Sequence, residues 1–164
     1  MSQVPVARDF MAKSLITLRP DMDIYEAIDV LIKHHISGAP VVDENKRLLG
    51  IISEKDCLRV FVNGAFFDLA GGQVADYMSK TVTTIDADAD VFKVADVLMK
   101  NTFRRLPVLD DGVLVGQVSR HDVLLTSRKM LESPQAKKQW TDSKYITPEM
   151  QAVLDSKQTH GGTT

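Results

Sequence analysis

The sequence predicts an α/β fold in which a β-α-β-β-α unit is duplicated and its two copies pack sheet to sheet with pseudo-two-fold symmetry. The first observation is a repeated motif, because GIISEKD at 50–56 and GQVSRHD at 116–122 share the spacing G-x-x-S-x-x-D. The second is wider self-similarity, since Asp9-Phe10-Met11 falls on Asp76-Tyr77-Met78. The third is size: a unit of about sixty residues is marginal alone, whereas two units can cover each other's apolar sheet faces.

The first repeat begins with a clear helix signal. Asp23 is expected to N-cap a helix in which Ile24, Ala27 and Leu31 share one apolar face, and Glu26 completes a capping box. A polar turn then separates two apolar strands. The predicted elements are an extended segment at 15–17, the helix after Asp23, strands at 39–42 and 48–52, and a second helix from after Ser53 to about Val62.

The second repeat follows the same order. Asp110-Asp111-Gly112 predicts a hairpin turn, because Gly tolerates the positive φ that tight turns need. The strands are nearly continuous apolar runs, so we expect both of their faces to be covered. The predicted elements are a helix at 91–100, strands at 106–109 and 113–118, and a last helix at about 120–131.

These elements divide the 164 residues into a lead-in at 1–8, a first repeat at 9–64, a linker at 65–75, a second repeat at 76–131 and a tail at 132–164. We expect Phe66, Phe67 and Leu69 to pack in the core or, alternatively, at a subunit interface. Thr147-Pro148 is typical of a helix start, so we expect the tail to be partly helical or disordered.

Composition excludes several classes of protein. The formal net charge of −2, from 22 acidic and 20 basic residues, predicts no general attraction to nucleic acid or to a membrane. No segment has the pattern of a signal peptide or a membrane span. Cys57 is the single cysteine, which excludes an intrachain disulfide and favours a reducing, cytoplasmic location.

The repeated motif has two interpretations. As a variant capping box, Ser caps backbone N–H groups and Asp stabilises the positive end of the helix dipole. As a ligand site, the free N–H groups of the helix attract an anion, Asp accepts hydrogen bonds from a ribose diol, and the Gly lets a planar base approach the backbone. The duplication at matched positions, Ser53 and Asp56 with Ser119 and Asp122, favours the ligand site.

A family resemblance supports this interpretation. The segments ISGAPVVDENKRLLGIISEKD and FRRLPVLDDGVLVGQVSRHD resemble the strand–turn–strand–helix segment of cystathionine-β-synthase-type (CBS) domains. The chain is therefore similar, over about residues 4–131, to a tandem CBS pair, or Bateman module, of the stand-alone bacterial type. The resemblance implies clefts that bind AMP, ADP, ATP, NAD or S-adenosylmethionine as effector, with no separate cofactor. It also implies a homodimer and a regulatory output, in which ligand binding changes conformation or affinity for an unknown protein partner.

The resemblance further implies which residues contact the ligand. The motif Asp holds the ribose, the motif Ser lies near ribose and phosphate, and the residues around the Pro-Val strand and the extended segment line the base or the phosphates. The implied ligand-binding residues are Thr17, Ser37, Gly38, Ala39, Pro40, Ser53, Asp56, Thr84, Arg104, Arg105, Leu106, Pro107, Ser119, Arg120, His121 and Asp122.

The two repeats differ in charge at these positions. Arg104-Arg105 stands where the first repeat has Ser37-Gly38, and Arg120-His121 stands where it has Glu54-Lys55. Phosphate prefers Arg because the guanidinium presents a fork of donors, although an Arg pair is also typical of a solvated surface.

Other functions have less support. A ligand-free scaffold or interaction protein is the main alternative to a nucleotide sensor. Cys57, in the first turn of a helix, could serve a redox sensor or weak enzyme, but a lone cysteine there is more often a small core residue. His34-His35 makes a poor metal pair because adjacent helical residues point apart. The sequence contains no recognisable catalytic constellation, so we predict that the chain is not an enzyme.

Overall fold

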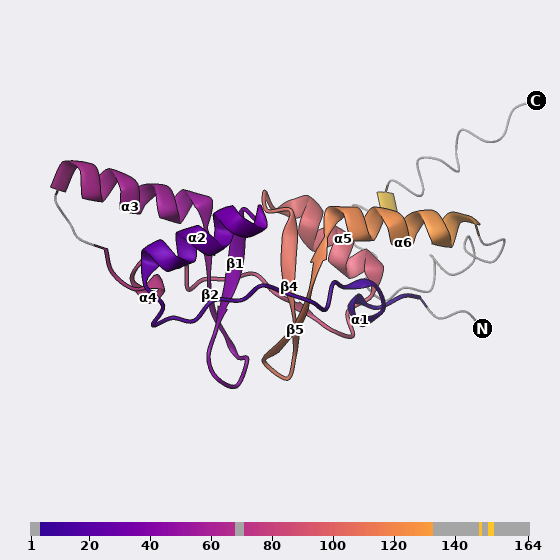
Figure 1. The fold of residues 1–164 in the computed structure, drawn as a ribbon. Coiled ribbons are helices and arrows are strands. Elements are labelled where there is room, and N and C mark those ends of the chain that lie inside the picture. The colour runs from indigo at the N-terminus through magenta and orange to yellow at the C-terminus, as the bar shows by residue number, and fades with distance from the viewer. Residues whose placement is uncertain (1–3, 68–70, 133–147, 149–150, 153–164) are drawn as a thin grey trace, which may run out of the picture. The chain divides into compact units, whose positions relative to one another are not determined.

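The computed structural model describes residues 4–67, 71–132, 148 and 151–152, and it confirms the α/β class (Figure 1). The chain divides into two compact units. Within the described residues, unit 2 comprises 13–84 and 109–116, and unit 1 comprises 4–12, 85–108 and the residues from 117 onward.

Unit 2 is built around an antiparallel hairpin. Strand β1 (Gly38–Val42) pairs with β2 (Leu48–Ser53), with Gly38 opposite Ser53 at one end and Val42 opposite Leu48 at the other. Helix α2 (Ile24–His34) precedes the hairpin and α3 (Glu54–Phe67) follows it directly. The hairpin therefore has a helix-start end at Ser53 and a turn end beyond Val42.

The predicted Asp23 cap of α2 is confirmed, without a return bond from the Glu26 side chain in the described structure. One carboxylate oxygen of Asp23, Oδ1, accepts hydrogen bonds from the N–H groups of Tyr25 at 2.8 Å and Glu26 at 3.4 Å. At the other end, His35 adopts a left-handed conformation with φ of 52° and its N–H donates to the carbonyls of Leu31 and Ile32. The helix ends there because this geometry satisfies its last carbonyls.

The core of unit 2 lies between these two helices and one face of the hairpin. Because side chains alternate along a strand, Ala39 and Val41 of β1 point to that face, whereas Pro40 and Val42 point to the opposite one. The buried members of the core are Leu18, Ile24, Ala27, Leu31, Ala39, Val41, Ile52, Cys57, Val60 and Val74.

Unit 1 contains the second pair of long helices and most of a three-stranded sheet. Helix α5 (Val91–Lys100) has the predicted bounds, and the Oδ1 atom of Asp90 caps it by accepting from the N–H of Lys93 at 2.9 Å. The strands are β3 (Ile85–Asp86), β4 (Arg105–Asp110) and β5 (Val113–Ser119), hydrogen-bonded in that order, and α6 (Arg120–Glu132) follows β5. The β4–β5 turn is the predicted one, with positive φ at Asp111 and Gly112.

Two single-turn helices were not predicted. Helix α1 (Ala7–Phe10) lies in unit 1, where the N–H groups of Ala7 and Arg8 donate to the carbonyls of Ala89 and Ala87. Helix α4 (Val74–Tyr77) lies in unit 2, where the N–H of Val74 donates to the carbonyl of Met22. Four residues are too few to show a helical period, so the sequence pattern cannot reveal such turns.

Helix α3 is longer than predicted, because it continues past Val62 to Phe67. The packing expected of Phe66, Phe67 and Leu69, and nearly all of the expected tail, concern side chains or residues outside the described part of the chain. None of the described helices has the length and apolar character that a membrane span requires.

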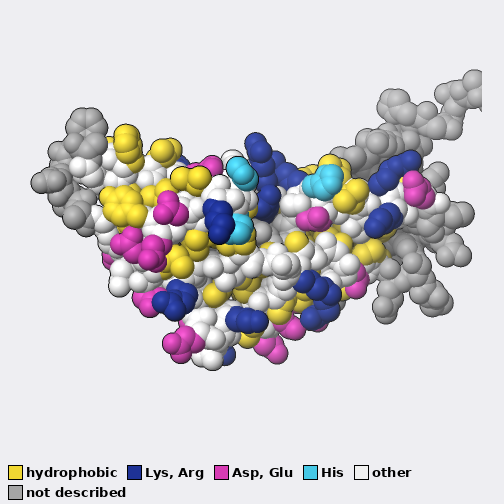
Figure 2. All heavy atoms as spheres, in the orientation of Figure 1, with side chains coloured by type: hydrophobic (Ala, Val, Ile, Leu, Met, Phe, Trp, Pro, Cys, Tyr) yellow, Lys and Arg dark blue, Asp and Glu magenta, His cyan; other side chains and the backbone are white. Residues whose placement is uncertain are grey.

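Both long helices that follow the motifs leave apolar side chains exposed. Phe61 of α3 is 72% exposed and Leu124 of α6 is 66% exposed. Figure 2 shows several hydrophobic side chains gathered over α3. The exposed large apolar residues of the two helices are Leu58, Phe61, Val62, Leu124, Leu125 and Leu131.

Candidate functional site

The motif of the first repeat forms a compact hydrogen-bonded arrangement at the start of α3. The Oδ2 atom of Asp56 accepts from the Ser53 N–H at 2.9 Å and from the Ser53 hydroxyl at 2.6 Å. The Asp56 N–H donates back to Ser53 Oγ at 3.3 Å. This reciprocal pattern is the variant capping box, so the capping interpretation of the motif is confirmed here.

The second repeat reproduces this geometry at the start of α6. Asp122 Oδ2 accepts from the Ser119 N–H at 2.8 Å and from its hydroxyl at 2.6 Å, and the Asp122 N–H donates to Ser119 Oγ at 3.2 Å. The serine hydroxyls therefore already donate to the carboxylates, which limits them to accepting from a ligand. Each carboxylate is held in one orientation by its own serine.

The second carboxylate oxygen differs between the repeats. Asp56 is 9% exposed, and its Oδ1 lies 3.7 Å from a guanidinium nitrogen of the exposed Arg59. Asp122 is half-buried, and its Oδ1 forms no hydrogen bond or ion pair with any residue that the structure describes. Oδ1 is thus the atom through which either Asp can accept a bond from a ribose hydroxyl.

The backbone N–H groups at the two helix starts are largely satisfied. The N–H of Glu54 donates to the Ser37 carbonyl at 2.9 Å, and the N–H of Arg120 donates to the Arg104 carbonyl at 3.1 Å. Together with the capped third N–H, this leaves the second N–H of each helix, that of Lys55 or His121, for an anion. These bonds also place Ser37, which precedes β1, at the start of α3, and Arg104, which precedes β4, at the start of α6.

In unit 2, the structure brings Ser37, Gly38, Ser53 and Asp56 together. Gly38 lies opposite Ser53, and a Cβ atom at Gly38 would lie 2.8 Å from the Ile52 carbonyl oxygen. Glycine is therefore required here by the close approach of β2. Glu54 and Lys55, both exposed, border this group, which carries no arginine at the matched positions.

In unit 1, Arg120 has a structural partner that the sequence did not reveal. One guanidinium nitrogen, NH2, donates to the carbonyls of Leu98 at 3.0 Å and Asn101 at 2.8 Å, at the C-terminal end of α5. Arg104 and Arg105 are exposed, and their side chains form no hydrogen bond or ion pair with any described residue. Those two arginines are therefore available to a phosphate, whereas Arg120 is engaged in capping α5.

Four of the expected contact residues have buried side chains. Ala39 and Leu106 are 1% and 0% exposed, and the prolines that follow them are buried as well. These side chains are buried and apolar, so they offer a ligand no polar group. The affected residues are Ala39, Pro40, Leu106 and Pro107.

Within the described residues, Thr17 and Thr84 form no hydrogen bond with the residues at the helix starts. Thr17 is exposed beside β1, where the neighbouring Leu18 pairs with Val41, and Thr84 directly precedes β3. Gly50 serves a close backbone contact, because a Cβ there would lie 2.7 Å from the Ser79 carbonyl oxygen. The space at Gly50 is thus filled by the chain and not open to a base.

Cys57 is a core residue. Burial raises the pKa of the Cys57 thiol, and the neighbouring carboxylates of Asp56 and Glu54 raise it further. The thiol is therefore protonated near neutral pH, which is the opposite of an activated cysteine. Among the described residues, no group of three or more His, Cys, Asp or Glu side chains is arranged to hold a metal ion.

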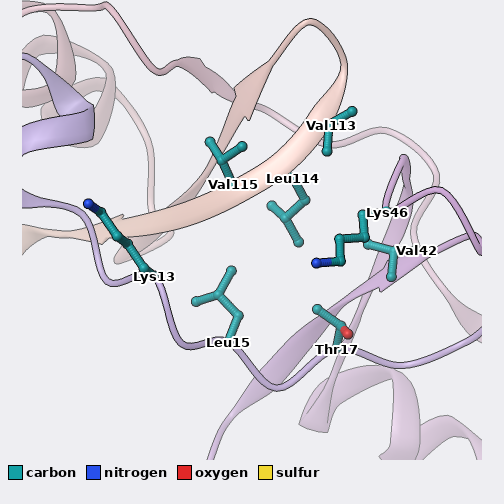
Figure 3. Close-up of a pocket in the computed structure, with 8 residues that line it drawn as sticks. All are labelled: Lys13, Leu15, Thr17, Val42, Lys46, Val113, Leu114 and Val115. Carbon is teal, nitrogen blue, oxygen red and sulfur yellow. The ribbon is translucent and has the colours of Figure 1, made fainter.

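A separate pocket of about 390 Å³ opens at the turn end of the hairpin in unit 2 (Figure 3). Sequence reasoning selected only Thr17 of its lining. The remaining lining residues are Lys13, Leu15, Val42, Lys46, Val113, Leu114 and Val115.

The comparisons with known proteins agree with this architecture. The family model of the CBS domain matches residues 7–63 and 74–128. Inosine-5'-monophosphate dehydrogenase of Methanocaldococcus jannaschii is 32% identical over 134 residues, which cover 81% of this chain and 25% of that enzyme. The chain spans between 22% and 41% of the length of the first curated relatives that it matches.

Two solved structures are similar over most of the chain. CBSX2 of Arabidopsis thaliana in complex with AMP has a TM-score of 0.67 and 27% identity, covering 77% of this chain and 98% of that one. The CBS domain pair of protein MJ0100, in complex with 5'-methylthioadenosine and S-adenosylmethionine, has a TM-score of 0.63 and 30% identity, with the same coverage. With both repeats matched, this chain belongs to the CBS-domain family, as a tandem pair.

Proposed function

We propose that this chain is a regulatory module that binds an adenosine-containing ligand at the starts of α3 and α6. The observation that carries the proposal is the pair of matching Ser–Asp arrangements, in each of which Oδ2 makes the cap bonds and Oδ1 takes no part in the cap. A diol needs such an oriented acceptor. The complexes of CBSX2 with AMP and of MJ0100 with S-adenosylmethionine support an adenosine ligand at a pair of this family.

The charge difference between the units sets the expected ligand at each. Arg104 and Arg105 have no partner among the described residues and stand beside the start of α6, so the unit 1 site suits a phosphate-bearing ligand such as AMP, ADP, ATP or NAD. The unit 2 site has Glu54 at the matched helix start, which disfavours a polyanion. It suits an adenosine derivative without phosphate.

The first experiment asks whether a ligand binds. The purified protein is denatured and the released small molecules are separated, and the refolded protein is titrated calorimetrically with AMP and adenosine. We expect adenine nucleotide release or saturable binding. If neither occurs, the chain is a ligand-free scaffold.

The second experiment locates the sites. Asp56→Asn and Asp122→Asn keep an oxygen that can accept the serine bonds but remove the charge, so stability changes by less than about 1 kcal/mol. Affinity at the altered site should fall at least about tenfold, because a charge-assisted bond contributes about 1.5–3 kcal/mol. Asp23→Asn is the matched control, since Asp23 caps a helix outside both sites. Unchanged AMP affinity in both site variants would reduce the motifs to caps.

We further propose a homodimer that uses the exposed apolar faces of α3 and α6, and a cytoplasmic location with no catalytic activity of its own. Light scattering on Phe61→Glu and Leu124→Glu tests the dimer, and both variants should be monomeric. Ile32→Glu on α2 is the control, because Ile32 is 66% exposed on another helix. If the wild-type protein is monomeric, the homodimer proposal is wrong, and the exposed apolar faces are assigned to binding of the regulated partner protein.

A further inference from the structure

The pocket of unit 2 lies away from the proposed adenosine site of that unit. The Ser53–Asp56 arrangement occupies the helix-start end of the β1–β2 hairpin, and the pocket occupies the turn end, beside Val42 and Lys46. It also opens on the opposite sheet face, because Val41 and Leu18 point into the helical core while their neighbours Val42 and Thr17 line the pocket.

The β1–β2 turn and the residues just after the β4–β5 turn are joined at this pocket. The N–H of Leu114 donates to the Lys46 carbonyl at 2.9 Å, and Arg47 pairs with Val113 as an antiparallel bridge. Leu114 is only 7% exposed, and with Leu15 and Val42 it forms an apolar wall. Backbone hydrogen bonding therefore fixes the two turns against each other at this pocket.

Lys46 has an unusual conformation for a lysine. Its φ is 59°, in the left-handed region, and the matched turn of the second repeat has Gly112 there with φ of 81°. A side chain at such a position costs roughly 1 kcal/mol that glycine would not. The first repeat therefore keeps a lysine at a position where its own duplicate uses glycine.

The Lys46 side chain faces the pocket. In Figure 3 it extends toward the space between Leu114 and Thr17, whereas the Lys13 nitrogen points away from the other labelled residues. Lys46 forms no ion pair with any carboxylate in the described part of the chain. One oxygen of the nearby Asp43 carboxylate, Oδ1, accepts from the N–H groups of Asn45 and Arg47.

We propose that this pocket binds a small monocarboxylate with an apolar body, held by Lys46. The pocket is open to solvent, with an apolar wall on one side and the exposed Lys46 and Thr17 beside it, which matches one negative charge on an otherwise hydrophobic molecule. A volume of about 390 Å³ is at the small end of ligand pockets. The site would give the module a second input beside its adenosine ligand.

Hexanoate is the probe, and methyl NMR of the full chain is the measurement. A molecule of this size binds with a dissociation constant on the order of 1 mM. We expect saturable shifts of the pocket methyls of Leu15, Val42 and Leu114, with the core methyls of Val60 unchanged. Hexanol, which lacks the charge, should bind about threefold to tenfold more weakly.

Lys46→Gly is the decisive variant, since it removes the ammonium and relieves the backbone, so the protein should be no less stable. Its hexanoate affinity should fall to that of hexanol, while Lys13→Ala should retain wild-type affinity. AMP affinity serves as an independent readout and should be unchanged in both variants. The proposal is overturned if hexanoate causes no saturable shift at these methyls, if hexanol binds equally well, or if Lys46→Gly binds hexanoate like the wild type.

Discussion

Arg105 and Arg120 both stand where the first repeat has no arginine, but the structure predicts opposite consequences for their removal. In Arg120→Ala, the carbonyls of Leu98 and Asn101 lose their donor at the C-terminal end of α5. A charge-assisted bond contributes about 1.5–3 kcal/mol when buried. One of these bonds is exposed and both use the same nitrogen, so we expect a combined loss of about 1–2 kcal/mol.

Urea unfolding of the ligand-free protein, followed by circular dichroism, measures this loss. With a slope of about 2 kcal/mol per molar urea, the midpoint should fall by about 0.5–1 M. Arg105→Ala is the matched control, because Arg105 is exposed and has no partner among the described residues. Its free energy of unfolding should change by less than about 0.5 kcal/mol.

AMP titration of the same two proteins should give the reverse order. Arg105→Ala should weaken AMP binding more than adenosine binding, because an arginine on phosphate does not contact the base. Arg120→Ala should change AMP affinity less than Arg105→Ala does. The reasoning is refuted if Arg120→Ala is as stable as the wild type, or if Arg105→Ala is the less stable of the two.

The remaining predictions concern the core and the backbone. Gly50→Ala should cost about 1–3 kcal/mol of stability by thermal or urea unfolding, because its Cβ would lie 2.7 Å from the Ser79 oxygen. Gly64→Ala, inside α3, should instead add up to about 1 kcal/mol because alanine favours a helix more than glycine does. Changes of the same sign in the two variants would contradict this reasoning. The raised pKa of Cys57 predicts a pH effect: the thiol's contribution is fully present below its ordinary pKa and is lost as pH rises through the higher folded value. Cys57→Ala should therefore lose less stability than the wild type between neutral and strongly alkaline pH in parallel urea titrations; parallel curves would rule this out.

Local signals predicted the long elements well. The bounds of α5 follow from Asp90 as the cap and from a clear helical period. Strand β4 is one residue longer than predicted at both ends, and β5 is one residue longer at its C-terminal end. The reciprocal cap at Ser53 and Asp56 could also be predicted from the sequence, because it depends on residues only three positions apart. The adenosine-contact residues, and the repeat boundaries, stay predictions.

The missed features depend on contacts between distant residues. Arg120 finds its acceptors about twenty positions earlier, at a helix end that only the tertiary fold brings near. The pocket joins two turns far apart in sequence, so no periodicity could reveal it. One signal was present nonetheless: aligning the turns places Lys46 against Gly112, a glycine-type position occupied by a lysine.

The discontinuity of the two units has a consequence for synthesis. Unit 2 includes residues 109–116, and unit 1 joins residues 4–12 to segments that begin at 85. A ribosome releases the chain from its N-terminus, so neither unit has all of its parts until most of the chain has emerged. Closing such long loops slows folding. The α1 segment must wait for Ala87 and Ala89, its hydrogen-bond acceptors, so we expect folding to be completed after translation of both repeats rather than one repeat at a time.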